Sequence, residues 1–309
     1  MKKFTIINNF LYGLKMFSKE LTGKTDYWHP KFPFRDCDLN QYKFKYFIDF
    51  SEKAIYPFEN KNGIPIINLK GIDYEFSITI LNYGLGLIDL DHNNNRAKIN
   101  LIYNWIELNM SKNGGIKNLT PLPRYGLENG WYSCLTQGLA LSFIARCINH
   151  KIVSKTRALP VLDLVFEFMK RSEINQMTKH GEILQEFESS ETSVLNGYIF
   201  GIYGLYDYGL IKGDFDFFKS HINTLKNILS KYQLPGGWSY YSLKGVVASR
   251  FYHRLHINML KSLFVITNDV YFKNLSQTWE KGYNYRLFYL LYKSIQKLIT
   301  IKHIHVLKN

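Results

Sequence analysis

Apolar residues recur at helical spacing from about residue 73 to residue 282. Gly, Pro, Asn or Asp separates most of the helix-length segments. The predicted helices span residues 75–90, 95–112, 131–149, 157–172, 192–208, 214–231, 250–267 and 270–282. Short connections make consecutive helices antiparallel. The pattern therefore predicts a mainly α fold, an (α/α) toroid or incomplete barrel, with a simple helical array as the alternative.

The chain before this helical region follows a different pattern. Residues 1–40 are mixed, with Pro30 and Pro33 favouring an irregular arm. Residues 41–70 resemble strands, because apolar and polar residues alternate and the segment 60–63 is typical of a turn. We therefore expect a small N-terminal β-hairpin or sheet.

The same patterns divide the chain into three predicted parts. Residues 1–72 form the arm and the small β element, and residues 73–283 form the helical toroid. Residues 284–309 form a basic amphipathic C-terminal helix. The stretch from residue 281 to 309 holds six Lys or Arg and no Asp or Glu. Such a helix either contacts an anionic membrane surface peripherally or packs on the body with a solvated basic face, and packing is slightly favoured.

Composition narrows the classes of partner. The formal net charge of +14 favours an anionic partner, which could be nucleic acid, a membrane surface or an acidic glycan. The sequence shows no Lys/Arg cluster, zinc-ligand array or aromatic RNA-binding signature, so nucleic acid is not expected. Aromatic residues reach 16%, which suits sugar faces but is also ordinary for cores and interfaces.

The cysteines and the first residues of the chain indicate the cellular compartment and whether a metal motif is present. The three cysteines, Cys37, Cys134 and Cys147, form no CxxC pair, so reduced and mostly buried thiols are expected and no metal motif is visible. The first residues resemble a signal peptide only over their first three positions, and no run of about 18 apolar residues follows. We therefore expect a cytoplasmic protein, with membrane-surface association as an extension of that expectation.

Three longer connections, 113–130, 178–191 and 232–249, are candidate sites, because functional groups concentrate on loops held by a rigid scaffold. The first leads into Trp131 and Tyr132, followed by Gln137. The aromatic pair either stacks on a sugar ring or forms a packing cluster at a helix start, and alone the packing cluster is favoured.

The second connection is acidic in an otherwise basic protein. It carries Glu182, Glu186, Glu188 and Glu191. A solvated acidic loop is the default interpretation, whereas one carboxylate turned into a cleft would be a proton acceptor. Two residues unfavourable for helices follow inside an apolar helical segment. Gly197 indicates close packing there, and Asn196 indicates a polar group facing a cavity.

The third connection and the helix after it are rich in aromatic and basic residues. If residues 250–260 are helical, Tyr252 and His256 share a face one turn apart. Nearby positive charge lowers the pKa of a phenol from about 10. The alternative is a half-buried Tyr252 and a hydrogen-bonded His256. The full cluster is Trp238, Tyr240, Tyr241, Lys244, Arg250, Tyr252, His253, Arg254 and His256.

These connections together carry a family resemblance. The segments NGWYSCLTQGLALS (129–142), SVLNGYIFGIYGLYD (193–207) and FYHRLHINML (251–260) resemble the D-glucuronyl C5-epimerase family. The segment ITILNYGLGL (78–87), which contains Tyr83, is similar to a further segment of that family. The resemblance covers about residues 40–283. It implies a helical toroid that converts glucuronosyl to iduronosyl residues in an acidic polysaccharide, without a metal or organic cofactor.

The resemblance also implies roles for residues. Glu186, Tyr252 and Tyr241 fall on catalytic positions of the family. The residues implied or expected to bind substrate are Asn196, Lys244, Arg250, His253, Arg254, His256, Trp131, Tyr132, Gln137 and Tyr83. Phe187 stands where the family has a tyrosine, and Lys244 stands where the family has an arginine. Related enzymes suggest a homodimer.

Two rival functions stay open. A polysaccharide lyase shares the first step, the removal of the C5 proton. A non-catalytic acidic-glycan-binding or assembly protein is motivated by Phe187 and by the basic C-terminal segment.

Overall fold

The computed structural model describes residues 18, 44, 48–58, 60–69, 71–188 and 192–306. The chain forms two compact units, one over Phe32–Ser230 and one that combines Lys231–Asn309 with Met1–Lys31. The predicted arm, apart from residue 18, and most of the predicted strand at 41–50 lie outside the described residues. The three-part domain division stays a prediction.

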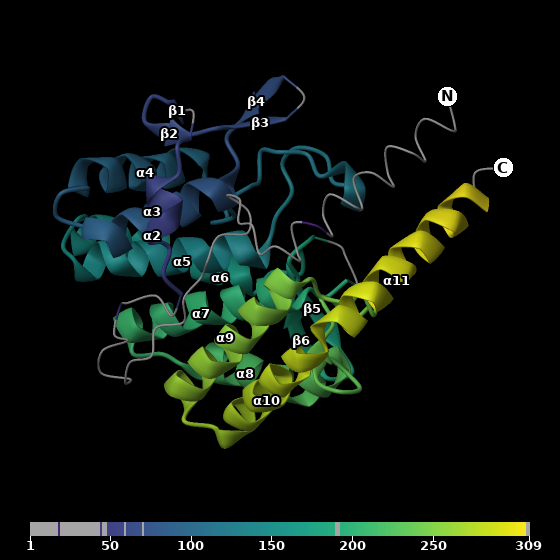
Figure 1. Cartoon of the computed structure of the whole chain (residues 1–309). Helices are drawn as coiled ribbons and strands as arrows, with labels where there is room; N and C mark the ends of the chain where they lie inside the picture. Colours follow the sequence, from purple (N-terminus) through teal and green to yellow (C-terminus); the bar gives the residue numbers. More distant parts are fainter. Residues whose placement is uncertain are drawn as a thin grey trace. The chain divides into compact units, whose positions relative to one another are not determined.

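Helices form most of the first unit (Figure 1). They are α3 (Ser77–Asp91), α4 (Arg96–Asn109), α5 (Cys134–Asn149), α6 (Lys155–Met169), α7 (Leu195–Lys212) and α8 (Asp216–Leu229). Each overlaps a helix predicted from the apolar spacing, so the predicted mainly α fold is confirmed. Small antiparallel two-stranded sheets complete it.

Helices α5 and α7 pack in parallel. Near their starts, Cys134 Sγ lies 3.3 Å from Gly197 O, and near their ends Arg146 pairs with Asp207. A Cβ on Gly204 would lie only 2.5 Å from the Cα of Gly138. Because both positions lack a side chain, the two backbones approach closely, and the N-termini of α5 and α7 meet at one end of the unit.

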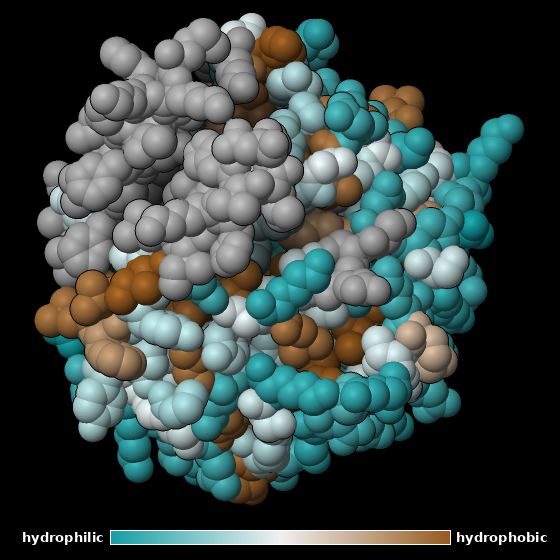
Figure 2. Space-filling view, turned by 90° about the vertical axis from the view of Figure 1, so that its right-hand side faces the viewer, coloured by the Kyte–Doolittle hydropathy of each residue, from teal (hydrophilic) through white to brown (hydrophobic). Residues whose placement is uncertain are grey.

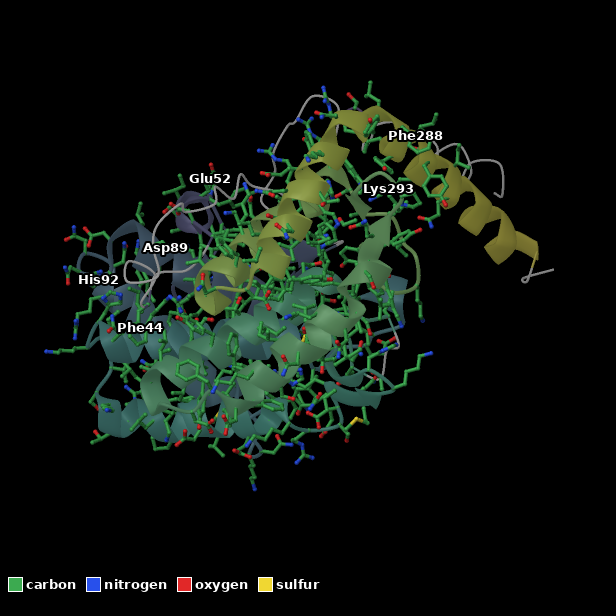
Figure 3. All side chains as sticks on the ribbon, turned by 90° about the horizontal axis from the view of Figure 1, so that it is seen from below. Phe44, Glu52, Asp89, His92, Phe288 and Lys293 are labelled. Atoms are coloured by element: carbon green, nitrogen blue, oxygen red, sulfur yellow. The ribbon has the colours of Figure 1, made fainter. Side chains whose placement is uncertain are left out.

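The residues before α3 correct part of the strand prediction. A short helix, α2 (Ser51–Ile55), occupies positions that alternation had assigned to a strand. Asp49 Oδ1 accepts a hydrogen bond from Ser51 N at 2.8 Å and so supports the first turn of α2. Phe50 N donates to Asp89 Oδ2 at 2.9 Å, which ties this segment to α3; Figure 3 labels Asp89.

Two hairpins follow α2 and form the predicted small β element. They pair β1 (Asn60–Lys61) with β2 (Ile64–Pro65), and β3 (Ile67–Leu69) with β4 (Ile72–Tyr74). A further hairpin was not predicted. It pairs β5 (Asn175–Thr178) with β6 (Gly181–Leu184) between α6 and α7 and ends immediately before Gln185. A 3₁₀ turn, η1 (Pro123–Tyr125), lies in the connection before α5.

The second unit is also mainly helical. It contains β7 (Gln233–Leu234), β8 (Trp238–Ser239), α9 (Arg250–Thr267), α10 (Val270–Gly282), η3 (Tyr283–Tyr285) and α11 (Arg286–Val306), with η2 (Ser230–Tyr232) at its start. Helix α11 packs through Tyr289, whose ring stacks 5.0 Å from Trp238. Leu287, Phe288 and Leu291 of α11 are exposed; Figure 3 labels Phe288 and Lys293 on this helix.

The surface in Figure 2 mixes hydrophilic and hydrophobic residues. Hydrophobic spots lie scattered among hydrophilic side chains over the described part of this face, as is normal for protein surfaces. Among the described residues, no helix combines the length and the apolar character that crossing a membrane requires.

Candidate active site

Glu186 lies where the starts of α5 and α7 meet. Directly before it, Gln185 O accepts a hydrogen bond from Cys134 N, the first residue of α5, at 3.0 Å. The side chain of Gln185 closes the following loop, because Ser193 N donates to Gln185 Oε1 at 3.1 Å and Gln185 Nε2 donates to Ser193 Oγ at 3.0 Å. These bonds fix both ends of the segment that carries Glu186.

The carboxylate of Glu186 accepts a hydrogen bond from the backbone of Gly197, in the first turn of α7. A Cβ on Gly197 would collide with Glu186 Oε2 and would lie 2.6 Å from Glu186 Cβ. Only glycine leaves room for the carboxylate at this helix start. The interpretation of Gly197 as a site of close packing is confirmed.

Burial makes Glu186 a weak acid. Its side chain is 7% exposed, and loss of hydration raises its pKa to about 8, although the hydrogen bond from Gly197 acts in the opposite direction. Its Oε2 atom has no hydrogen-bond partner, and neither has Oδ1 of the buried Asn196, which precedes Gly197 in the chain. A carboxyl group with a pKa near neutrality can both take and return a proton.

The other described glutamates of this connection accept hydrogen bonds from neighbouring residues of the protein. Glu182 Oε2 accepts a hydrogen bond from Asn175 Nδ2 at 3.0 Å. Glu188 Oε2 accepts one from Tyr132 N at 2.8 Å. Glu191 lies outside the described residues. Among the described members of the acidic connection, Glu186 alone combines burial with an unpartnered carboxylate oxygen.

Trp131 and Gln137 are buried and support the scaffold, and their expected contact with substrate stays a prediction. Trp131 is 2% exposed, and its indole N–H donates to Thr120 O at 2.8 Å. Gln137 is fully buried, and its amide exchanges hydrogen bonds of 3.1 and 2.9 Å with the backbone N and O of Ile116. Through these hydrogen bonds, both side chains hold the connection before α5 in place.

Two other expected contact residues are partly exposed. Tyr132 packs its ring 4.6 Å from that of Phe168, and Lys117 Nζ lies 5.7 Å from the Tyr132 ring centroid. Tyr83 on α3 packs against Phe58 at 6.3 Å, and burial raises its pKa. Both belong to the same unit as Glu186.

An aromatic contact beside Glu186 was not predicted from the sequence. The ring of Tyr125 in η1 stacks 4.1 Å from that of Phe187, with 25° between their planes. Phe187 is buried, whereas Tyr125 is 37% exposed. The two residues are 62 positions apart, so no local spacing could have indicated the pair.

A second cluster forms at the start of α9 in the other unit. Ser249 caps this helix by accepting a hydrogen bond from Tyr252 N at 3.3 Å. The ring of Tyr252 lies 4.8 Å from that of Tyr241 and 6.4 Å from that of His256. The structure therefore brings Tyr241, Tyr252 and His256 together, as the predicted helix implied for the last two.

A tight turn positions Tyr241 and Lys244. Tyr241 N donates to Val246 O at 2.6 Å, and Gln296 of α11 donates through Nε2 to Gly245 O at 2.7 Å. Lys244 is exposed at the tip of this turn. Helix α11 thus supports the segment that carries one tyrosine and one cation of the predicted site.

The two arginines of α9 face away from Tyr252. Each lies two residues from Tyr252 along the helix, which corresponds to a rotation of roughly 200°. Arg250 Nε donates to the hydroxyl of Tyr283, and Arg254 is exposed. The expected contact of both arginines with substrate stays a prediction.

His253 has a structural role, and its expected contact with substrate stays a prediction. It is fully buried, stacks 3.9 Å from Trp238 and forms a hydrogen bond to Trp279 O at 3.1 Å. Burial lowers its pKa to about 3. His253 is therefore neutral and held inside the unit. Within the described part of the chain, no group of three or more His, Cys, Asp or Glu could hold a metal ion.

A buried carboxyl group that titrates near neutrality is suited to proton transfer, and tyrosine hydroxyls can serve the same chemistry. A family model described as the D-glucuronyl C5-epimerase C-terminus matches residues 117–281. The match covers more than half of the 309 residues and includes Glu186, Tyr241, Tyr252 and His256. The chain belongs to this family, which supports epimerase-like chemistry on a uronate.

Proposed function

We propose that the protein is a polysaccharide uronate C5-epimerase that converts D-glucuronosyl to L-iduronosyl residues in an acidic polymer. The observation that carries this proposal is the state of Glu186. It is buried, one of its carboxylate oxygens is unpartnered, and its pKa is raised to about 8. The family membership and the net charge of +14 support the same conclusion.

The proposed reaction needs a proton donor and a proton acceptor on opposite faces of the sugar. Glu186 is proposed to remove or return the C5 proton, and the family resemblance implies Tyr252 as a further proton-transfer residue. No atom is gained or lost, because the sugar exchanges one hydrogen for another and its C5 centre is inverted. Exchange of both protein groups with solvent restores the starting protonation state.

Charge development sets the electrostatic requirement. Removal of the C5 proton turns the uronate carboxylate into an enolate-like dianion, so preorganised positive groups must offset this charge. Lys244, exposed on the turn that carries Tyr241, is the cation proposed for this role. The Tyr241 hydroxyl is proposed to donate a hydrogen bond to the same group.

The missing tyrosine hydroxyl at Phe187 bears on the same site. Phe187 is buried, and the partly exposed Tyr125 stacks on it. We therefore include Tyr125 as a phenol-bearing contact to the sugar on the Glu186 side.

The test is an incubation of the purified protein with heparosan-type glucuronan in D₂O, followed by NMR. Deuterium at C5 together with iduronate signals is the expected result. An unsaturated product that absorbs in the ultraviolet would replace the proposal with a lyase. Binding of the glycan without C5 exchange would replace it with an acidic-glycan-binding protein.

A further inference from the structure

Helix α11 packs onto its own unit through one side. Tyr289 and Leu290 on this side are each 3% exposed, and the Tyr289 ring stacks 5.0 Å from that of Trp238. Two turns after Tyr289, Gln296 Oε1 accepts a hydrogen bond from Val247 N at 3.1 Å. These contacts fix which side of the helix is turned inward.

The opposite side of α11 carries apolar side chains that are open to solvent. At about 100° per residue, the five of them fall within an arc of roughly 140° around the helix axis. Each is between 41% and 64% exposed. This outer stripe consists of Leu287, Phe288, Leu291, Tyr292 and Ile295, and Figure 3 labels Phe288.

The outer stripe reverses the usual arrangement of a surface helix. Such a helix normally turns its apolar side toward the core and a polar side toward water. Helix α11 buries Tyr289 and Leu290 and still leaves the five side chains of the outer stripe exposed. Single exposed apolar residues are ordinary, but a continuous stripe marks an interaction surface. The outer stripe therefore needs a partner that accepts apolar side chains.

The charge around the outer stripe is positive. Residues 281–309 hold six Lys or Arg and no Asp or Glu. Lys281 and Arg286, which lie just before the stripe, are both exposed. An anionic bilayer matches this combination, because its acyl chains accept apolar and aromatic side chains while its headgroups attract cations.

The same charge disfavours a second copy of the chain as the partner. A two-fold contact through the outer stripe would bring one 281–309 segment against another, so like charges would face each other. An acidic polysaccharide would attract the cations but is too hydrophilic to bury leucine and isoleucine side chains. An anionic lipid surface satisfies both the charge and the apolar stripe.

We propose that α11 docks the protein on an anionic lipid surface, with the outer stripe inserted among the acyl chains near the headgroups. The helix lies along the surface, because only one of its sides is available to lipid. The inward side of α11 also supports the turn that carries Tyr241 and Lys244, through the hydrogen bond from Gln296 Nε2 to Gly245 O. Docking therefore brings that turn to the lipid surface.

Co-sedimentation of the purified full chain with lipid vesicles tests the proposal. We expect binding to vesicles of phosphatidylcholine with phosphatidylglycerol, and weaker binding to phosphatidylcholine alone or at high salt. The double variant Leu287→Ser/Leu291→Ser should reduce the affinity for the anionic vesicles by about tenfold to a hundredfold, because two apolar side chains no longer enter the bilayer.

A matched control separates the outer stripe from general surface hydrophobicity. Leu90→Ser/Leu108→Ser removes two exposed leucines from α3 and α4 and should leave vesicle binding unchanged. Thermal unfolding verifies that both double variants are folded. Equal losses in the two double variants, or no binding of the wild type to anionic vesicles, would overturn the proposal.

Fluorescence quenching locates the inserted side of the helix. Phe288→Trp places an indole on the outer stripe, and vesicles whose acyl chains carry bromine should quench it. Leu108→Trp places an indole on α4 and should show no added quenching over the wild type. Quenching of the Leu108→Trp indole alone, or of neither indole, would overturn the proposal.

Two further measurements reveal a different occupant. Analytical ultracentrifugation shows whether the wild type is a dimer that Leu287→Ser/Leu291→Ser converts to a monomer. Calorimetric titration with a glucuronan oligosaccharide shows whether the same variant loses glycan binding. Either loss, in a protein that does not bind anionic vesicles, would assign the outer stripe to a second copy or to the polymer and overturn the proposal.

Discussion

Each end of the α5–α7 pair buries a carboxyl group, but the two groups have different partners. At the C-terminal end, Asp207 lies 2.7 Å from Arg146, and both side chains are 1% exposed. At the N-terminal end, Glu186 is 7% exposed, and no described ion pair includes it.

The partners of each group explain the difference. Burial raises the pKa of Asp207, and the charge of Arg146 opposes this rise only in part. Glu186 receives only a backbone hydrogen bond from Gly197, so burial prevails and its pKa rises to about 8. Burial raises the pKa of both carboxyl groups, but only Asp207 has a charged partner, so the C-terminal end holds an ion pair and the N-terminal end holds a carboxyl group without one.

The largest expected effect tests the reactive end. Glu186→Gln removes the titrating group but keeps its size, so C5 exchange should fall by about 10²–10⁴-fold, the usual contribution of a positioned acid or base. NMR of glucuronan in D₂O measures the rate. Glu182→Gln, on the preceding hairpin strand, is the matched control and should retain exchange. Equal rates for the wild type and Glu186→Gln would remove Glu186 from the mechanism.

The next effect tests the structural end. Arg146→Met leaves Asp207 buried without its partner, which should lower the free energy of unfolding by about 3–5 kcal/mol. Urea denaturation at neutral pH measures this change. Lys212→Met breaks the exposed pair with Asp163 and should cost at most about 1 kcal/mol. Similar losses in both variants would contradict a special role for the buried pair.

The pH dependence of stability should differ between wild type and Glu186→Gln. Because the folded pKa of Glu186 is raised, the unfolded chain ionises first, and the wild type loses stability as pH rises from about 4.5 to about 8. Each unit of raised pKa corresponds to about 1.4 kcal/mol, so the free energy of unfolding should fall by a few kcal/mol across this range. Denaturation series across this pH range should show a shallower decline for the variant. Parallel curves would show that Glu186 titrates normally.

The smallest effect concerns the space at the start of α7. Gly197→Ala introduces a Cβ that collides with Glu186, and such overpacking costs about 1–3 kcal/mol. The displaced carboxylate should also slow C5 exchange. Gly201→Ala lies one turn later, where the new Cβ would meet Leu184 Cδ1 at 3.0 Å, and it should have little effect on exchange. Unimpaired exchange in Gly197→Ala would show that the position of Glu186 tolerates movement.

The apolar spacing predicted the helices of both units to within a few residues, because long periodic segments bury one face whatever their neighbours are. Short elements were harder to predict from the sequence. Helix α2 depends on Asp49 and on contact with α3, and the β5–β6 hairpin depends on its place between two helices. The separation of Arg250 and Arg254 from Tyr252 did follow from helical periodicity, although the resemblance had grouped them.

By itself, the sequence determined the helical class, the family and the segments that carry the chemistry, because periodicity and motif order are local properties. The tertiary structure decided how deeply each side chain of these segments is buried and which partners it has. Glutamates a few residues apart are alike in sequence, yet Glu186 alone among those described is left buried with an unpartnered oxygen. Likewise Ser239 and Trp279 pair both ring nitrogens of His253, whereas only Nδ1 of His256 has a hydrogen-bond partner. Burial and hydrogen-bond partners set protonation, and both are supplied by residues distant in the chain.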